Sequence, residues 1–157
     1  MDYYCLRALE MTPRLLEREI RRIGPSGWDA RPHPDRFTPR EDVCHLADWE
    51  PIMLTRIKVG VETPGGAIVA YDEGVIAIEH DYASKDPLAE AANFKADRAK
   101  TIEYIKSLKP EDFEKTVEHP ERGTTKVNDL ITMLVAHDVY HIEHMAFIDS
   151  GKVVDTW

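Results

Sequence analysis

The sequence contains only two cysteines, and none of its apolar runs approaches the length of a membrane span. Cys5 and Cys44 form no Cys-x-x-Cys pair, so we expect no disulfide scaffold and two free thiols in a reducing compartment. A membrane-spanning helix needs about 18 to 20 apolar residues in succession. The first residues also lack a basic stretch followed by an apolar core, so no signal peptide is expected. A cytoplasmic location without membrane association is predicted.

Positive charge is scarce as well. Lys and Arg total 20 against 29 Asp and Glu, which gives a formal net charge of −9. An acidic chain does not attract phosphate backbones, and no predicted helix is rich in Lys or Arg, so a nucleic-acid partner is not expected. Strand-like alternation is nearly absent, with residues 75–78 as its one weak candidate. These absences leave helices as the main elements.

The chain is long enough for one domain, which we expect to cover residues 1–157, and 43% of its residues are hydrophobic. Four segments carry helical patterns. The first, over residues 2–23, has apolar residues at spacings of four, three, four and three, which place them on one face. These residues are Leu9, Pro13, Leu16, Ile20 and Ile23. Thr12-Pro13 is expected either to start this helix or to kink it.

The other three helices have recognisable starts. The motif from Thr38 to Glu41 is a capping box with proline at the first helical position, and it predicts a helix to about residue 60. Asp86 followed by Pro87 is again an N-cap residue followed by proline, and it predicts a third helix that ends near residue 108. The last helix is predicted over about 126–150. Helices joined by turns, without strands, predict an all-α four-helix bundle.

Residues 61–85, between the second and third helices, are the least regular part of the chain. Glycine and proline interrupt them repeatedly, although a short helical turn is expected near residues 74–79. A loop of this length is uncommon in a compact domain unless it covers a site or forms an interface. The later connection, over residues 110–125, is expected to hold a short acidic turn.

Three of the seven histidines share the last predicted helix. His137 and His141 are four residues apart, so their rings project from one side and can reach a single ion. The two histidines lie on the same face of the helix as the apolar residues Leu130 and Leu134, so the rings are expected to point into the bundle. Burying imidazoles without partners costs roughly a few kcal/mol per polar group. A metal or buried hydrogen-bond partners would offset that cost, and the spacing leaves both open.

A third metal ligand has to come from another segment. His45, in the middle of the second helix, is the best candidate. His33 lies between prolines, and His80 and His119 lie in acidic connections, so these three are expected to be solvated. The pattern is not that of a zinc peptidase, because Asp138 stands where that motif has its glutamate.

Several short segments together resemble the DinB family, the DinB/YfiT-like metalloenzymes, and the resemblance covers nearly the whole chain. They are HLADWE at 45–50, YDE at 71–73, a third helix that bears Arg98, GTT at 123–125 and HDVYH at 137–141. The resemblance implies an up-down-down-up helix order with a long crossover loop between the second and third helices. It also implies a homodimer. The loop residues available for that contact, or for packing on their own bundle, are Ile68, Val69, Val75 and Ile76.

The resemblance further implies a metal held by three histidines, one from the second helix and two from the fourth. Carried over to this chain, the ligands are His45, His137 and His141. Family members commonly have Gln where this chain has His144. That residue is open to three roles: a fourth ligand, a base beside the site, or a hydrogen-bonding group in the core. We expect it to line the pocket.

Three neutral imidazoles leave the charge of an ion intact and leave coordination positions open. These donors suit zinc or nickel, and also iron or manganese. Two reactions on a small-molecule substrate then compete, namely hydrolysis and transfer of a low-molecular-weight thiol. The resemblance favours the second, since relatives of the fold include thiol-S-transferases and thiol-dependent isomerases. A non-catalytic metal site that stabilises the bundle is the alternative.

Either reaction needs a base or an orienting carboxylate. Asp48, one turn after His45, is predicted to be such a catalytic residue, together with His144. Glu41, one turn before His45, can also point toward the metal site. A solvated place on the helix surface is the competing interpretation for both carboxylates. Arg56, on the His45 face, is expected either to hold an anionic substrate or to form a surface ion pair.

Overall fold

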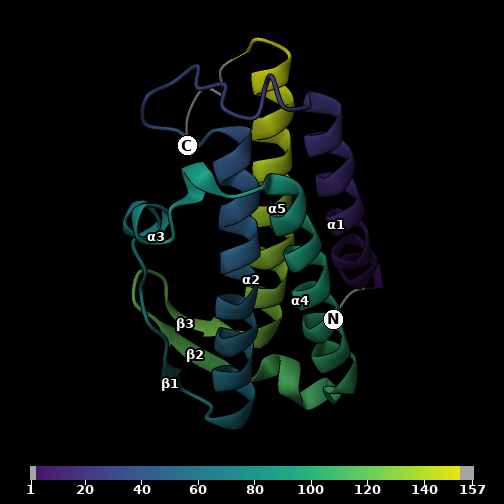
Figure 1. The fold of residues 1–157 in the computed structure, drawn as a ribbon. Helices are drawn as coiled ribbons and strands as arrows, with labels where there is room; N and C mark the ends of the chain where they lie inside the picture. The colour runs from purple at the N-terminus through teal and green to yellow at the C-terminus, as the bar shows by residue number, and fades with distance from the viewer. Residues whose placement is uncertain (1–2, 153–157) are drawn as a thin grey trace.

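Four long helices form the body of the computed structural model, which describes residues 3–152 (Figure 1). They are α1 (Tyr3–Ile23), α2 (Pro39–Glu62), α4 (Pro87–Ser107) and α5 (Val127–Asp149). Both α1 and α2 pack mainly against α4 and α5, so α1 and α2 face each other across a diagonal. In Figure 1, α1 runs up, α2 and α4 run down, and α5 runs up again. The predicted four-helix bundle with up-down-down-up order is confirmed, with a small sheet added.

The crossover from α2 to α4 contains β1 (Gly66–Ala67), α3 (Glu73–Glu79) and the short 3₁₀ helix η1 (Tyr82–Ser84). The helical turn expected near residues 74–79 is confirmed as α3. Its N-cap is Asp72, whose carboxylate accepts a hydrogen bond from the N–H of Val75 at 3.0 Å. The weak strand prediction for residues 75–78 was wrong, because this cap satisfies a free N–H of the first turn and favours the helix.

The connection from α4 to α5 holds more structure than the expected acidic turn. The 3₁₀ helix η2 (Pro110–Glu114) is followed by an antiparallel hairpin of β2 (Thr116–His119) and β3 (Gly123–Lys126), and β1 pairs in parallel with β2. His119 pairs with Gly123 across a three-residue turn. Gly123 has φ +69, a left-handed conformation that glycine adopts without steric cost. The sequence reasoning missed this sheet.

The sheet lies close against the C-terminal half of α2, and Gly60 makes this approach possible. A Cβ at Gly60 would lie 2.6 Å from Cγ2 of Val127 and 3.1 Å from Cγ1 of Val117. The missing side chain therefore lets the hairpin and the start of α5 contact the helix backbone directly.

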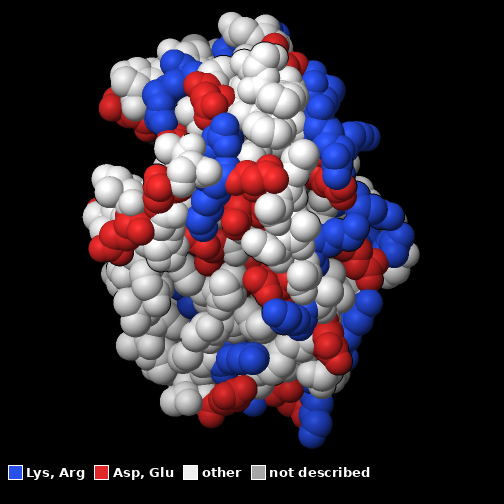
Figure 2. All heavy atoms as spheres, in the orientation of Figure 1, with Lys and Arg blue, Asp and Glu red and all other residues white. Residues whose placement is uncertain are grey.

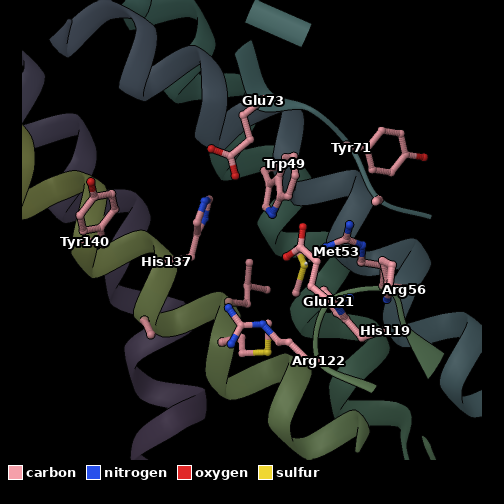
Figure 3. Close-up of a pocket in the computed structure, with 15 residues that line it drawn as sticks. Trp49, Met53, Arg56, Tyr71, Glu73, His119, Glu121, Arg122, His137 and Tyr140 are labelled. Atoms are coloured by element: carbon pink, nitrogen blue, oxygen red, sulfur yellow. Dashed lines mark hydrogen bonds between the residues drawn. The ribbon is translucent and has the colours of Figure 1, made fainter. Parts of the chain in front are cut away.

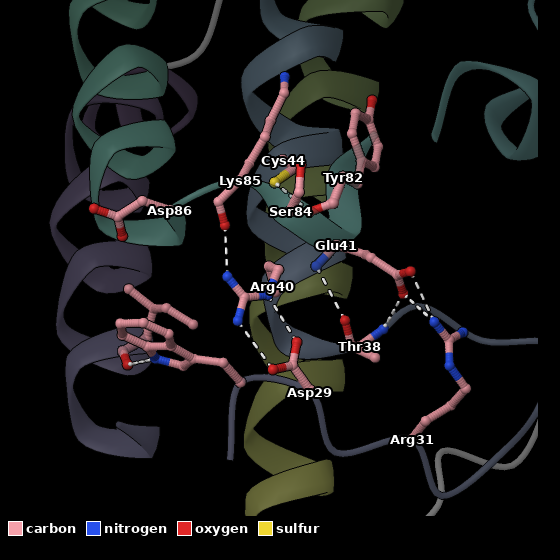
Figure 4. A network of polar contacts seen from close by, with 12 residues as sticks. Asp29, Arg31, Thr38, Arg40, Glu41, Cys44, Tyr82, Ser84, Lys85 and Asp86 are labelled. Atoms are coloured by element: carbon pink, nitrogen blue, oxygen red, sulfur yellow. Dashed lines mark hydrogen bonds and ion pairs between the residues drawn. The ribbon is translucent and has the colours of Figure 1, made fainter. Parts of the chain in front are cut away.

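The predicted capping box fixes the start of α2 (Figure 4). The hydroxyl of Thr38 accepts from the N–H of Glu41 at 3.2 Å, and the Glu41 carboxylate accepts from the N–H of Thr38 at 2.7 Å. Arg31 donates to the same carboxylate, while Arg40 donates to the carbonyl of Lys85 at the end of the crossover. These bonds hold the first turns of α2 against both neighbouring segments, and the site residues project from those turns.

Two apolar clusters fill the bundle, and a polar layer separates them along its axis. One cluster contains Leu9, Met53 and Leu134, and the other contains Leu16 and Phe94. The predicted apolar face of α1 is confirmed, because all five of its residues are buried. The polar layer between the clusters consists of buried side chains from all four helices. They are Thr12, Asp42, His45, Glu50, Arg98, Asp138, His141 and His144.

Other expectations from composition have mixed outcomes. Cys5 and Cys44 are free thiols, as predicted. Within residues 3–152, none of the helices has both the length and the apolar character to cross a membrane. Of the apolar loop residues, Ile68 packs into the core, whereas Val69 and Val75 are exposed. A dimer contact through the exposed residues stays a prediction.

Helix α1 continues through Pro13 without the expected interruption. Proline has no N–H, so it cannot donate to the carbonyl four residues earlier, which belongs to Leu9. Arg98 of α4 donates to that carbonyl instead, at 3.4 Å. The predicted start at Pro13 was wrong, because a side chain from another helix replaces the missing backbone donor and the helix continues on both sides of Pro13.

The guanidinium of Arg98 connects all four helices. It donates two hydrogen bonds to Glu50 of α2, at 2.8 and 2.7 Å, and two to Asp138 of α5, at 2.6 and 3.0 Å. It also donates to the hydroxyl of Thr12 in α1, which in turn donates to Asp138. Burial alone would lower the pKa of Arg98, but the two carboxylates outweigh it and raise the pKa.

Arg98→Met is expected to destabilise the fold by about 3 to 5 kcal/mol, because it leaves two buried carboxylates without their cation. Lys100→Met is the control, since Lys100 pairs with Asp97 on the surface of the same helix and exposed pairs contribute little. The free energy of unfolding in urea measures both. Equal stability of the two variants would contradict the role given to Arg98.

Candidate metal centre

Three imidazole nitrogens converge in the polar layer of the bundle. His45 projects from α2, and His137 and His141 project from α5. The Nε2 atom of His137 lies 2.9 Å from Nε2 of His45 and 3.2 Å from Nε2 of His141. Two nitrogens bound at about 2.0–2.1 Å to one ion, at angles of about 90° to 109°, lie about 2.9 to 3.4 Å apart. The structure thus brings the three predicted ligands together with the spacing that one ion requires.

A buried carboxylate fixes the proton on one of these rings. Asp42 is fully buried and lies 2.7 Å from Nδ1 of His141 and 2.7 Å from Nδ1 of His144. An ionised carboxylate only accepts hydrogen bonds, so both Nδ1 atoms carry the proton. The Nε2 atom of His141 is therefore left with its lone pair facing the other two histidines, in the form that binds a metal.

The charges around the cluster also suit a cation. Burial would raise the pKa of Asp42, but the hydrogen bonds from His141 and His144 outweigh it, and the pKa is lowered. Burial and the two neighbouring imidazoles lower the pKa of His45, and burial, His141 and Arg98 lower that of His137. These rings are neutral, as metal ligands must be. The Nδ1 of His137 is buried without a hydrogen-bond partner among the described residues.

The predicted catalytic residues Asp48 and His144 do not join this cluster. Asp48 faces the crossover, where its carboxylate lies 2.6 Å from Nδ1 of His80 and 3.9 Å from Nζ of Lys85. Three residues turn a helix by about 300°, so Asp48 points about 60° away from His45. Asp48 does not line the pocket beside the cluster, and a catalytic role for it stays a prediction.

His144 keeps to the stripe of His137 but lies about 10 Å further along the helix, where it reaches Asp42 instead of the pocket. The expected pocket-lining role was therefore wrong, and hydrogen bonding in the core describes His144 best. Glu41 also turns away, because it caps α2 and pairs with Arg31.

A pocket of about 540 Å³ opens beside the cluster, and His137 belongs to its wall (Figure 3). Its walls come from α2, α5, the crossover and the tip of the β2–β3 hairpin. Apolar groups predominate near the helices. The polar and charged residues of the wall are Arg56, Tyr71, Glu73, His119, Glu121, Arg122 and Tyr140.

Glu73 supplies a carboxyl group to this pocket. Figure 3 shows its carboxyl end directed toward the space between His137 and Trp49, although the residue as a whole is exposed. Burial of the carboxyl group raises its pKa, and the nearby Glu121 adds to that effect, while His141 and Arg56 oppose it. A carboxylate whose pKa is raised is a stronger base than an ordinary carboxylate.

Comparisons with known proteins identify the family of the chain. The family model described as the DinB superfamily matches residues 8–145 of the chain. The chain belongs to the DinB superfamily. Its relatives include a protein of Oceanobacillus iheyensis, 25% identical over 94% of this chain and 85% of its own length, and one of Bacillus mycoides, 27% identical over 89% and 80%. Both are named "Putative metal-dependent hydrolase".

Solved structures show the same fold. YfiT from Bacillus subtilis, described as "a probable metal-dependent hydrolase with an unusual four-helix bundle topology", aligns with a TM-score of 0.88 at 22% identity. The alignment covers 94% of this chain and 85% of YfiT. A DinB-like protein of the same species aligns with a TM-score of 0.65 at 11% identity, over 94% and 91%.

Three residues of this DinB-superfamily site escaped the sequence reasoning. Asp42 was given no role, although it precedes His45 by almost one turn. Glu73 was quoted only as part of the YDE segment, and no role was given to it. His119 was expected to be solvated, but it is buried at the end of β2. The β-branched residues on both sides of Gly123 were the available signal for that hairpin.

His45→Ala and His137→Ala are each expected to reduce bound metal to near background, because two imidazoles hold a divalent ion poorly. His33→Ala is the control, since His33 is exposed and far along the chain from the cluster. Elemental analysis of the purified proteins gives the metal content per chain. Unchanged content in both cluster variants would rule out this site.

Asp42→Asn is expected to weaken metal affinity by about 10- to 100-fold, because the partner that orients His141 loses its charge. Asp48→Asn is the matched control, as Asp48 is on the same helix and points away from the cluster. Competition with a metal chelator measures both affinities. Equal loss in the two variants would show a general effect of acidic residues instead.

Proposed function

We propose that this DinB-superfamily protein is a metal-dependent enzyme that hydrolyses a small molecule. One observation carries the proposal: His137 belongs both to the cluster of three Nε2 atoms and to the wall of the pocket. A ligand in the pocket would therefore lie beside an ion held by His45, His137 and His141. The names of the relatives as metal-dependent hydrolases support the same conclusion.

The donor set defines what the metal contributes. A divalent ion on three neutral histidines keeps its full charge and open positions, and it lowers the pKa of a water or thiol beside it. Zinc and nickel suit the site best, and iron or manganese are compatible with it. Asp42 holds the His141 ring in position.

Glu73 is the proposed proton acceptor, because its carboxyl end faces His137 within the pocket. The apolar walls, which include Trp49, Met53 and Leu134, exclude water and bind the body of a substrate. Asp48, for which such a role was predicted, faces away from the cluster.

Thiol transfer is the second candidate. A pocket of about 540 Å³ lies within the range for drug-sized ligands, so it admits a low-molecular-weight thiol next to a small electrophile. The thiol would have to come from outside, because neither Cys5 nor Cys44 lines the pocket. Glu73 would then accept the proton of the thiol.

Two other functions have less support. A purely structural metal would be enclosed by four ligands including His144, whereas His144 faces Asp42 and His137 faces the pocket. Nucleic-acid binding calls for a basic surface, whereas blue and red residues intermingle on the face seen in Figure 2.

Glu73→Gln is expected to lower kcat by about 10²- to 10⁴-fold while metal content stays unchanged. In the wild type, activity should rise with pH through the raised pKa of Glu73, because the base works only when deprotonated, and the variant should lose this rise. Glu79→Gln, at the other end of α3, is the control. A panel of esters and amides, assayed with zinc and nickel, measures hydrolysis.

The same panel with and without added thiols separates the two reactions. Turnover that needs no thiol indicates hydrolysis, and turnover that depends on thiol concentration indicates transfer. Wild-type rates in the Glu73→Gln variant would contradict the role of Glu73 in either reaction.

A further inference from the structure

Arg56 is a buried cation without a carboxylate partner. Only 7% of its surface is exposed, and no acidic group of residues 3–152 forms an ion pair with it. Its one hydrogen bond to oxygen goes to the carbonyl of Val69, at 2.8 Å. Its Nε is buried and has no partner among the described residues. Arg98, the other deeply buried arginine, has two carboxylates.

This arrangement is costly, and the protein offsets the cost only in part. Burial lowers the pKa of Arg56, which shows that its charged form is disfavoured there. The guanidinium carbon lies 5.3 Å from the ring centre of Trp49 and 5.8 Å from that of Tyr71, so two aromatic faces stabilise the charge. Such contacts position a guanidinium without using up its N–H donors.

Arg56 belongs to the pocket wall (Figure 3), where, among the described residues, its Nη1 contacts only the sulfur of Met53, at 3.8 Å. His119 and Arg122, from the hairpin, lie on the same wall. Nδ1 of His119 accepts from the N–H of Glu121 at 3.2 Å, so the neutral ring carries its proton on Nε2 and can donate from there. Burial and the charges of Arg56 and Arg122 lower the pKa of His119.

We propose that Arg56, with His119 and Arg122, binds a carboxylate of the substrate, while the apolar body of the substrate lies along Trp49 and its reacting group faces His137. The planar guanidinium matches a carboxylate in a two-bond contact. Glu121 and Glu73 on the same wall oppose a group with two negative charges, so a monoanion fits better than a phosphate. This inference rests on the proposed function for its substrate, but not for the binding of the anion itself.

Binding of benzoate to the full-length, metal-free protein tests the inference without any reaction. Benzoate is expected to bind at least about tenfold more tightly than benzamide, its neutral counterpart, because bonds to a charged group are the stronger ones. It should also shift the ¹⁵N–¹H signal of Arg56 Nε. Equal affinity of the two compounds would overturn the proposal.

Arg56→Gln is expected to weaken benzoate binding by about tenfold or more and to leave benzamide binding unchanged. Lys58→Gln is the matched control, since Lys58 lies on the same helix but contacts Tyr104. Benzoate affinity that is the same in Arg56→Gln and wild type would overturn the proposal.

Glu121→Gln tests the proposal with a variant that is expected to bind benzoate more tightly, so a loss of folding cannot imitate the result. Glu121 is exposed and belongs to the same wall, so its neutralisation should tighten benzoate binding severalfold. Glu118→Gln, elsewhere on the hairpin, should not. A gain in affinity cannot come from a damaged fold, and no gain, or an equal gain in both variants, would count against the proposal.

The His45→Ala protein separates this inference from the proposed function. Benzoate binding that persists in His45→Ala supports an anion site independent of the metal ligands. If metal binding and catalysis are found but the benzoate preference is absent, only the anion site fails. If the anion site is found but the wild type holds no metal, only the proposed enzyme fails.

Discussion

The buried guanidinium of Arg98 sets how the four helices align along their axes. It comes from α4, and its partners are Glu50 of α2, Asp138 of α5 and Thr12 of α1. Asp138 follows the metal-ligand candidate His137 directly, and Glu50 comes five residues after His45. A slip of α2 or α5 by one turn would therefore break the ion pairs and separate the histidines together. The same bonds that hold the bundle also set the spacing of the three Nε2 atoms.

The interior near the cluster contains more negative than positive charge. Asp42, Glu50 and Asp138 are all buried, and Arg98 is the cation that lies among them. When these groups and the nearby buried Arg56 are ionised, one net negative charge remains, which favours a cation at the cluster. If neutral histidines were its only neighbours, a buried cation would have no opposite charge nearby, and its burial would cost much free energy. The surrounding carboxylates, which are not ligands themselves, provide this negative charge.

Much of the fold could be predicted because its signals are local. The capping box from Thr38 to Glu41 and the proline after Asp86 mark helix starts in the sequence itself, and the four-residue spacing of His137 and His141 requires one helix face. The contacts that were missed join distant segments. Arg98 is 48 residues from Glu50 and 40 from Asp138, and nothing in the local pattern pairs them. Pro13 looked like an interruption because the donor that rescues its helix lies in α4. Asp48 contacts His80 and not the cluster, because proximity in sequence to His45 does not determine which neighbour a side chain faces.

The pocket wall is divided between two kinds of structure. Trp49, Met53, Arg56 and His137 come from the long helices, whereas Tyr71, Glu73, His119, Glu121 and Arg122 come from the crossover and the hairpin tip. The helices are constrained by the core. The connections enter the core through apolar residues such as Ile68 and Val117, but their wall residues Glu73, Glu121 and Arg122 are exposed. Changes in the connections can therefore reshape the rim of the pocket without repacking the bundle. Different proteins built on this scaffold can keep one reactive centre and acquire different substrates by exchanging only these two segments.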